Sequence, residues 1–251
     1  MYTRLIGLFA FALPLTAATS ALAGDQKGLE IMLRPAYGSA PADSPVYRFN
    51  TGVLKNDTGT LASGTDKPYG GGFVGSAYIG YRFASFMSVG LRGGYRSSSA
   101  AAVTDGSTNL KREAWDAGLY LRAYPLAPVP AVGKFIDPWI SLGVIYNRDV
   151  QTFDRSIATT AGQIPGNWKL DHHAVAVPIG IGVDYRLLPM LSVGPSFEYA
   201  IAVPVSGCVA WSAPGLVSGA KFCSTDPPGD AFMRANGYGV WSIGVQARIT
   251  L

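Results

Sequence analysis

The last stretch of the chain, residues 236–251, reads NGYGVWSIGVQARITL and decides the fold. One alternate set of its side chains is apolar or small and includes Trp241 and Ile243, whereas the other set includes Gln246 and Arg248. Successive side chains of a β-strand point to opposite faces, so one face could meet lipid and the other could not. About 9–11 tilted residues of this period cross a bilayer. The stretch therefore predicts a transmembrane β-strand.

The N-terminal residues predict export. Arg4 supplies a positive charge, residues 5–18 form an apolar core, and Ala21-Leu22-Ala23 is a small-x-small cleavage site. These are the parts of a secretory signal peptide, and the apolar core is too short for a spanning helix. We expect residues 1–23 to be removed and residues 24–251 to form a single domain.

The composition of the chain favours strands in a membrane. After the signal peptide no apolar run reaches the about 18 residues of a transmembrane helix, yet 48% of the residues are hydrophobic and only 14% are charged. The 31 glycines and the 12% of aromatic residues suit curved sheets and membrane interfaces. The basic residues are scattered singly and the net charge is only +4, so we expect no nucleic-acid partner.

Seven further segments alternate in the same way as the last one. The connections between them are long after the first, third, fifth and seventh segments, and short after the others. This pattern predicts an all-β fold, an eight-stranded antiparallel up-and-down transmembrane β-barrel. The segments are 28–38, 70–83, 86–97, 115–124, 136–148, 172–187 and 190–203.

The long connections are predicted as loops and the short ones as turns. Loops cover 39–68, 98–111, 149–171 and 204–234, and a hairpin hidden in the first or last of them would raise the strand count to ten. In bacterial outer-membrane barrels the short turns are periplasmic. We therefore expect both termini in the periplasm and the long loops outside the cell.

Alternation alone leaves open which face is outside, because a soluble lipocalin-like barrel would turn its apolar face inward. Three features favour a membrane barrel. The chain lacks a Gly-x-Trp signature near its first strand, the polar faces are mostly Gly, Ala and Ser with isolated charges, and the apolar faces end in aromatic residues, as an interfacial girdle requires. These aromatic residues are Tyr37, Phe83, Tyr95, Trp115, Tyr146, Tyr185 and Tyr199.

The polar faces then supply the charges of the lumen. An eight-stranded barrel barely holds its own side chains, and an unpaired charge in a dry interior costs several kcal/mol. We expect these residues to form a structural ion-pair network; the alternative is a polar path for a small solute or a gated pore. The set is Glu30, Arg34, Arg82, Arg92, Arg96, Asp116, Arg122, Asp184, Arg186, Glu198 and Arg248.

The two cysteines of the chain, Cys208 and Cys223, lie in one Gly/Pro/Ser-rich stretch. In an exported chain they predict one disulfide. Closing a loop of about fifteen residues is worth roughly 3 kcal/mol on the chain-entropy model. No second Cys or His lies close enough in sequence to suggest a metal site.

The two histidines, His172 and His173, are the candidates for enzyme chemistry, because some eight-stranded barrels act on lipid A with a His, a Ser and an acidic partner. A His-x-Ser pair would need serine at 174 or 175, where the chain has Ala174 and Val175. We expect both histidines to be rim residues in contact with solvent or headgroups. No catalytic, cofactor-binding or metal-binding residue is predicted.

On its signal peptide, strand count and terminal strand, the chain resembles the small bacterial outer-membrane β-barrel superfamily, which includes the membrane domain of OmpA, OmpX, OmpW and opacity-type surface proteins. Members typically end in an aromatic residue, whereas this chain ends in Leu251. The resemblance implies residence in the outer membrane of a Gram-negative bacterium, and membership is expected at the level of the superfamily only.

The resemblance implies a function without catalysis. We expect a monomer whose long loops serve surface contact or envelope integrity. Expected partners are outer-membrane lipids and lipopolysaccharide, the barrel assembly machinery during biogenesis, and an external ligand or host surface at the loops. A narrow OmpW-like channel for small or apolar solutes is the alternative, followed by a lipid A-modifying enzyme.

Overall fold

The computed structural model describes residues 27–39, 47–49, 71–99, 108–129, 135–159, 162–212, 221–223, 233–235 and 238–251. The expected signal peptide, residues 1–23, lies outside the described residues. Among the described residues, no helix is long and apolar enough to cross a membrane.

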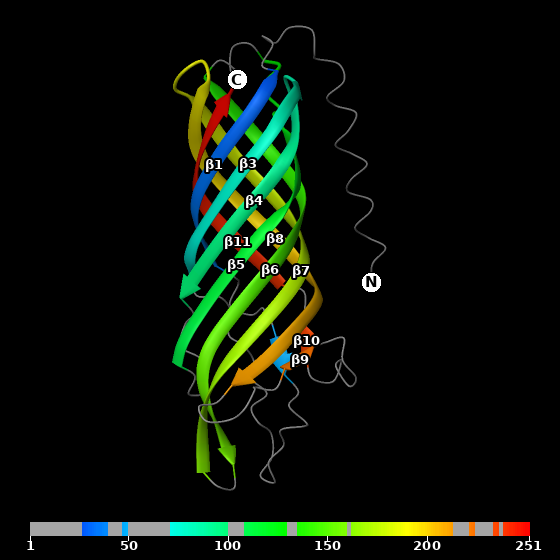
Figure 1. Ribbon diagram of the computed structural model, residues 1–251. Coiled ribbons are helices and arrows are strands. Elements are labelled where there is room, and N and C mark those ends of the chain that lie inside the picture. Colours follow the sequence, from blue (N-terminus) through cyan, green and yellow to red (C-terminus); the bar gives the residue numbers. More distant parts are fainter. Residues whose placement is uncertain are drawn as a thin grey trace.

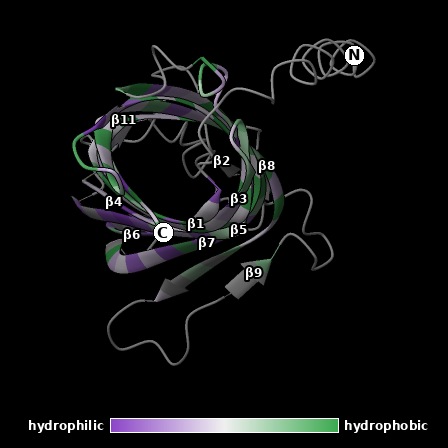
Figure 2. Cartoon of the chain, turned by 90° about the horizontal axis from the view of Figure 1, so that it is seen from above, coloured by the Kyte–Doolittle hydropathy of each residue, from purple (hydrophilic) through white to green (hydrophobic). Residues whose placement is uncertain are grey.

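Eight strands form a closed antiparallel ring (Figures 1 and 2). Each strand pairs with its neighbours along the chain, and the last strand also pairs with the first, which closes the ring. The predicted eight-stranded up-and-down barrel is confirmed. The ring consists of β1 (Gly28–Ser39), β3 (Gly72–Ala84), β4 (Met87–Ser99), β5 (Thr108–Ala123), β6 (Ile136–Thr159), β7 (Gly162–Arg186), β8 (Leu191–Ser212) and β11 (Tyr238–Thr250).

The C-terminal strand closes the barrel against the first strand. Ile249 lies opposite Ile31, and Ile243 lies opposite Tyr37. Leu251 continues the ladder, because its N–H donates to the carbonyl of Leu29 over 2.9 Å and its own carbonyl accepts from the N–H of Leu29 over 3.0 Å. The first and last strands therefore pair, as closure of the predicted barrel requires.

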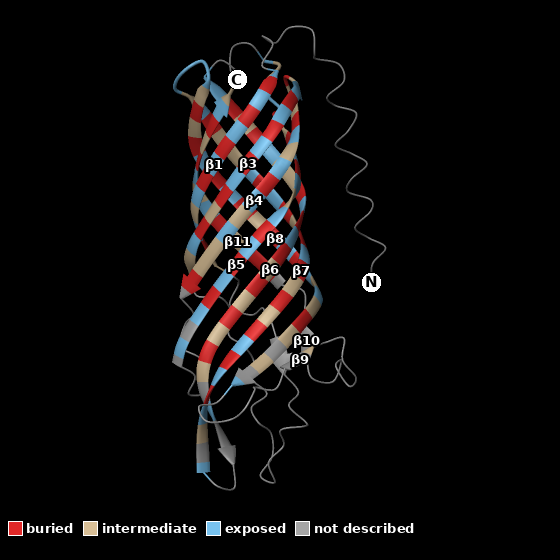
Figure 3. Cartoon of the chain, in the orientation of Figure 1, coloured by how far each residue is buried: buried red, intermediate tan, exposed pale blue. Residues whose placement is uncertain are grey.

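The polar face of each strand points into the barrel. Along β1, buried and exposed residues alternate: Leu33 is 58% exposed, whereas its neighbour Arg34 is 1% exposed. The same alternation of buried and exposed positions runs along the other strands of the ring (Figure 3). The apolar side chains thus form an outer belt, and the charged ones lie in the lumen.

The belt ends in exposed aromatic side chains. Trp115 and Tyr146 lie together at one end, with ring centroids 5.8 Å apart. The next outward residues along the same strands, Glu113 and Arg148, are charged. The hydrocarbon boundary at this end of the barrel is therefore set at Trp115 and Tyr146.

Short turns connect the strands at the other end, which we call the turn end. Ser85 and Phe86 join β3 to β4, and residues 187–190 join β7 to β8, where the N–H of Leu191 donates to the carbonyl of Leu188 over 3.2 Å. The proline-rich stretch after β5 also turns here. The opposite end, toward which the strands lengthen, is the loop end.

Three strands run much farther toward the loop end than their apolar alternation predicts. Residues 149–171 were expected to form a loop, but they continue β6 and β7 as a hairpin, and residues 204–212 continue β8. That part of the loop prediction is wrong, because a strand outside the membrane needs no apolar outer face. We call residues 148–159, 162–173 and 204–212 the wall extension (Figure 1).

Three short strands occupy the other predicted loop regions without joining the ring. β2 (Tyr47–Phe49) and β10 (Met233–Ala235) pair with each other, and β9 (Lys221–Cys223) pairs with the end of β8. Within the described residues, the barrel therefore has eight strands and not ten.

Glycines on the inner face make room for large lumen side chains. A Cβ at Gly182 would lie 2.5 Å from the ring of Trp139, and one at Gly80 would lie 2.6 Å from the hydroxyl of Tyr120. These close approaches require the absence of a side chain. The lumen is packed tightly at these two positions.

Candidate functional site

The first layer of the lumen, near the turn end, is an ion-pair network. Asp137 accepts from Arg82 over 3.0 Å and from Arg248 over 2.7 Å. Arg248 also lies 3.5 Å from Glu30 and 3.4 Å from Asp184. All five side chains are buried. Because charges of both signs meet at short distances, the network offsets much of the cost of removing them from water.

Aromatic rings fill the space between these guanidinium groups. Tyr124 has Arg82 3.8 Å and Arg248 4.8 Å from its ring centroid, and its hydroxyl donates to Glu30 over 2.9 Å. Arg122 lies 3.9 Å from the ring centroid of Trp139. Stacking of this kind adds cation–π attraction where water is absent. The rings and the guanidinium groups therefore pack closely against one another in this layer.

Hydrogen bonds tie Arg122 into the same layer. Its Nη2 donates to Gln246 over 2.9 Å, and Gln246 donates to the carboxylate of Asp184 over 3.2 Å. Trp139 also donates to Asp184, over 3.1 Å. In this layer the guanidinium groups of Arg82, Arg122 and Arg248 are balanced by the carboxylates of Glu30, Asp137 and Asp184.

A second layer lies closer to the loop end. Arg92 donates to Glu198 over 2.7 Å and to Asp116 over 3.0 Å, and the hydroxyl of Tyr78 donates to Glu198 over 3.2 Å. Arg34 donates to the hydroxyl of Ser196 over 2.8 Å. Two buried guanidinium groups again face two buried carboxylates. The charges within each layer therefore balance.

The structure brings most residues of the expected lumen set together in these layers. Nine of them are buried: Glu30, Arg34, Arg82, Arg92, Asp116, Arg122, Asp184, Glu198 and Arg248. Arg96 and Arg186 are half-buried on inward positions, Arg96 toward the loop end and Arg186 at the turn end.

Sequence reasoning missed several members of the network. Asp137 joins Arg82 to Arg248, and its place on the polar face of the 136–148 segment was the signal that could have included it. Tyr78, Tyr120, Tyr124 and Trp139 also face inward and are buried. A search limited to charges overlooks them because their role is to stack on the guanidinium groups.

The inner face of the wall extension carries another buried ion pair. Arg112 donates to Asp149 through Nε over 2.9 Å and through Nη2 over 2.6 Å. His172 lies opposite Asp149 and is 0% exposed. The expectation that His172 contacts solvent or headgroups is therefore wrong: the position is on the inward face of β7. Burial there lowers the pKa of His172 to about 4.

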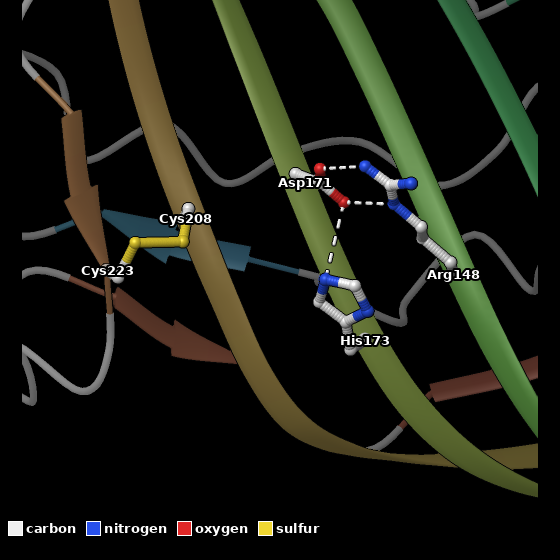
Figure 4. Close-up of a disulfide and its surroundings, with 5 residues drawn as sticks. All are labelled: Arg148, Asp171, His173, Cys208 and Cys223. Atoms are coloured by element: carbon white, nitrogen blue, oxygen red, sulfur yellow. Dashed lines mark hydrogen bonds and ion pairs between the residues drawn. A yellow bond between two sulfur atoms is a disulfide. The ribbon is translucent and has the colours of Figure 1, made fainter.

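The outer face of the extension carries a partly exposed charged cluster (Figure 4). Arg148 donates to Asp171 through Nε over 2.8 Å, and His173 Nε2 lies 3.5 Å from the same carboxylate. The hydrogen bond from Arg148 holds the pKa of Asp171 below its ordinary value. Tyr146 contacts the other ring nitrogen of His173. Ser206 lies opposite His173 in the ladder between β7 and β8, but the two ring nitrogens of His173 face Tyr146 and Asp171, which leaves neither of them to take a proton from a serine hydroxyl.

The disulfide joins β9 to the outer part of β8. Cys208 and Cys223 are directly opposite each other in the ladder and are bonded, as predicted. Cys208 also lies opposite Asp171 on β7 (Figure 4). The bond therefore fastens the end of the wall extension beside the charged cluster. Among the described residues, no group of His, Cys, Asp and Glu could hold a metal ion.

Comparison with known proteins supports this architecture. No model of a protein family matches the sequence, and no curated protein sequence matches it. The solved structure of Neisserial surface protein A matches with a TM-score of 0.50 at 9% identity, covering 89% of this chain and 97% of that one. A major outer membrane protein from Thermus thermophilus matches with a TM-score of 0.51 at 13% identity, covering 88% and 99%.

The fold is that of a small outer-membrane β-barrel. At such low identities the likeness concerns the fold alone, so the location must also rest on the surface of this chain. That surface carries an apolar belt bounded by aromatic rings, which is what a barrel in a bilayer exposes. Fold and surface together place the protein in an outer membrane.

Proposed function

We propose that the protein is a non-enzymatic, non-conducting outer-membrane barrel that holds the wall extension outside the cell for surface contact or envelope integrity. The observation that supports this proposal most directly is the packing of the lumen, in which Arg82 and Arg248 are bound to Asp137 and stacked on Tyr124. A solute would have to separate buried ion pairs, at a cost of several kcal/mol each.

The orientation follows from the unequal ends of the barrel. The turn end has short connections, whereas the loop end carries the wall extension with its disulfide. Outer-membrane barrels place short turns in the periplasm and longer connections outside. The surroundings of the belt are then outer-membrane lipids and lipopolysaccharide, and the extension is the part that meets an external ligand or a host surface.

Labelling of single cysteines in intact cells tests this orientation. Lys169→Cys, on the exposed outer face of the extension, is expected to react with a membrane-impermeant maleimide in intact cells. The matched control is Leu188→Cys, at an exposed position of a turn-end connection, which should react only after the outer membrane is permeabilised. The reverse pattern would overturn the proposal.

A further inference from the structure

The outer wall of the barrel contains a groove that interrupts the apolar belt. It has a volume of about 410 Å³ and crosses β1, β3 and β4 in the half of the belt nearer the loop end. Its accessible lining is almost entirely apolar. Gly75, Ala77 and Gly93 form its floor, and Leu33, Phe73 and Tyr95 border it.

Small residues in neighbouring strands produce the hollow. Ala77 lies opposite Gly93, and Gly93 lies opposite Ala117. The next outward row toward the turn end is large and exposed, with Ile79 opposite Leu91. The outer surface is therefore hollow at the row of Ala77 and Gly93, and the larger side chains of Ile79 and Leu91 form one edge of the hollow.

Gly93 shows that the hollow is free space. A Cβ at this position would find only the carbonyl oxygen of Asp116 within 4 Å, at 3.9 Å. A Cβ could therefore point outward here without a close contact to the protein. Nothing in the backbone requires glycine at this position, so the shape of the outer surface is what the glycine determines.

The surroundings of the groove identify its occupant. It opens on the lipid-facing side of the barrel, where the solvent is hydrocarbon, and Tyr95 at its loop-side border lies opposite Trp115 of the aromatic boundary. With the loop end outside, as proposed above, this half of the belt lies in the outer leaflet. We propose that the groove binds one acyl chain of the lipid A part of lipopolysaccharide.

The preference of the groove for this chain comes from shape. The surrounding hydrocarbon is as apolar as the groove, so an acyl chain gains nothing from polarity by entering it. Contact area and packing therefore decide whether the chain prefers the groove. Each extra carbon contact contributes only about 0.1–0.2 kcal/mol, but a chain lying in a groove makes many of them. A modest selectivity of about threefold to tenfold is expected, lost when the floor of the groove is filled.

Native mass spectrometry of the full refolded protein tests the proposal. The protein is released from detergent after incubation with equimolar lipid A and phosphatidylethanolamine, and the retained lipids are counted. Gly93→Leu and, independently, Ala77→Leu fill the groove. Ala123→Leu adds similar bulk on the outward side of the belt at the turn end and serves as the control. Folding of each variant is checked by circular dichroism.

Preferential retention of lipid A by the wild-type protein and by Ala123→Leu, with a loss of about threefold or more in both filled variants, supports the site. Equal retention in wild type and filled variants would overturn it. Equal retention of the two lipids would also overturn it, and so would a dimer that Gly93→Leu abolishes, because a second copy would then occupy the groove. Cysteine labelling reports the orientation separately, so failure of the groove and failure of the proposed function are distinguishable.

Discussion

β6 and β7 pass through two environments, and the residues on their outer faces change between them. Within the belt, the outward positions hold apolar residues such as Val144 and Ile179. In the wall extension the outward positions hold charges such as Lys169, and the inward ones hold Phe153 and Trp168, whose rings stack with centroids 6.2 Å apart. What an outward position of these strands carries therefore depends on what lies outside it, lipid or water.

The same contrast applies to ion pairs. Arg248 and Asp137 meet at 2.7 Å with both side chains 2% exposed. Arg148 and Asp171 meet in the extension with their side chains 35% and 22% exposed. The chemistry is identical, but only the first pair is removed from water. Its loss leaves a buried charge, whereas loss of the second leaves a solvated one.

Truncation of one arginine in each pair should show the largest difference. Arg248→Ala leaves Glu30, Asp137 and Asp184 without their shared cation and is expected to cost about 3–5 kcal/mol. Arg148→Ala should cost less than about 1 kcal/mol. Equilibrium unfolding in urea of barrels refolded into lipid vesicles measures both. Equal costs would show that the lumen is wet.

An arginine substituted on the outer surface should have different effects in the belt and in the wall extension. Leu119→Arg, at a position 60% exposed in the belt, should cost about 2–4 kcal/mol because it puts a charge into hydrocarbon. Val150→Arg lies between Glu113 and Asp171 in the extension and should change stability by less than about 0.5 kcal/mol. A similar penalty at both sites would move the hydrocarbon boundary beyond residue 150.

Removal of the disulfide should affect the extension alone. The double variant Cys208→Ser, Cys223→Ser is expected to destabilise the end of β8 locally by about 3 kcal/mol on the chain-entropy model. Hydrogen exchange should therefore accelerate in residues 204–212 and stay unchanged in residues 191–201. Faster exchange in both segments would mean that the extension and the barrel unfold as one unit.

Acidification should loosen the extension through His172. Its pKa is about 4 in the folded protein, below the ordinary 6.5, so under pH 6.5 the unfolded segment binds more protons. Neutral His172 makes its full contribution to the stability of the extension above pH 6.5. This contribution is lost as the pH falls toward 4, with about 2 kcal/mol lost by pH 5. Asp171, whose pKa is also lowered, loses its contribution only below about pH 4.

Hydrogen exchange of the β6–β7 hairpin at pH 7 and pH 5, corrected for intrinsic rates, measures this effect. His172→Gln should remove most of the pH dependence in this window. A hairpin with the same pH dependence in both proteins would assign the effect to another group.

The sequence predicted the ring because strands within the belt carry the apolar alternation that lipid demands. The same alternation predicted which charges face the lumen. Arg34 and Arg248, for example, alternate with the apolar residues of their strands. It could not predict the extension, where Asp149 and His172 lie inward and Arg148 and Asp171 lie outward, so that polar residues occupy both phases. Nor could it give the partners of each charge, because Arg82, Asp137 and Arg248 come from three strands.

Single-channel recording of the refolded wild-type protein in planar bilayers tests the central claim most directly. The packed layers of Arg82, Asp137, Arg248 and Tyr124 predict that the barrel inserts without reproducible conductance steps. Reproducible steps of uniform size would contradict the closed lumen and favour a narrow channel instead.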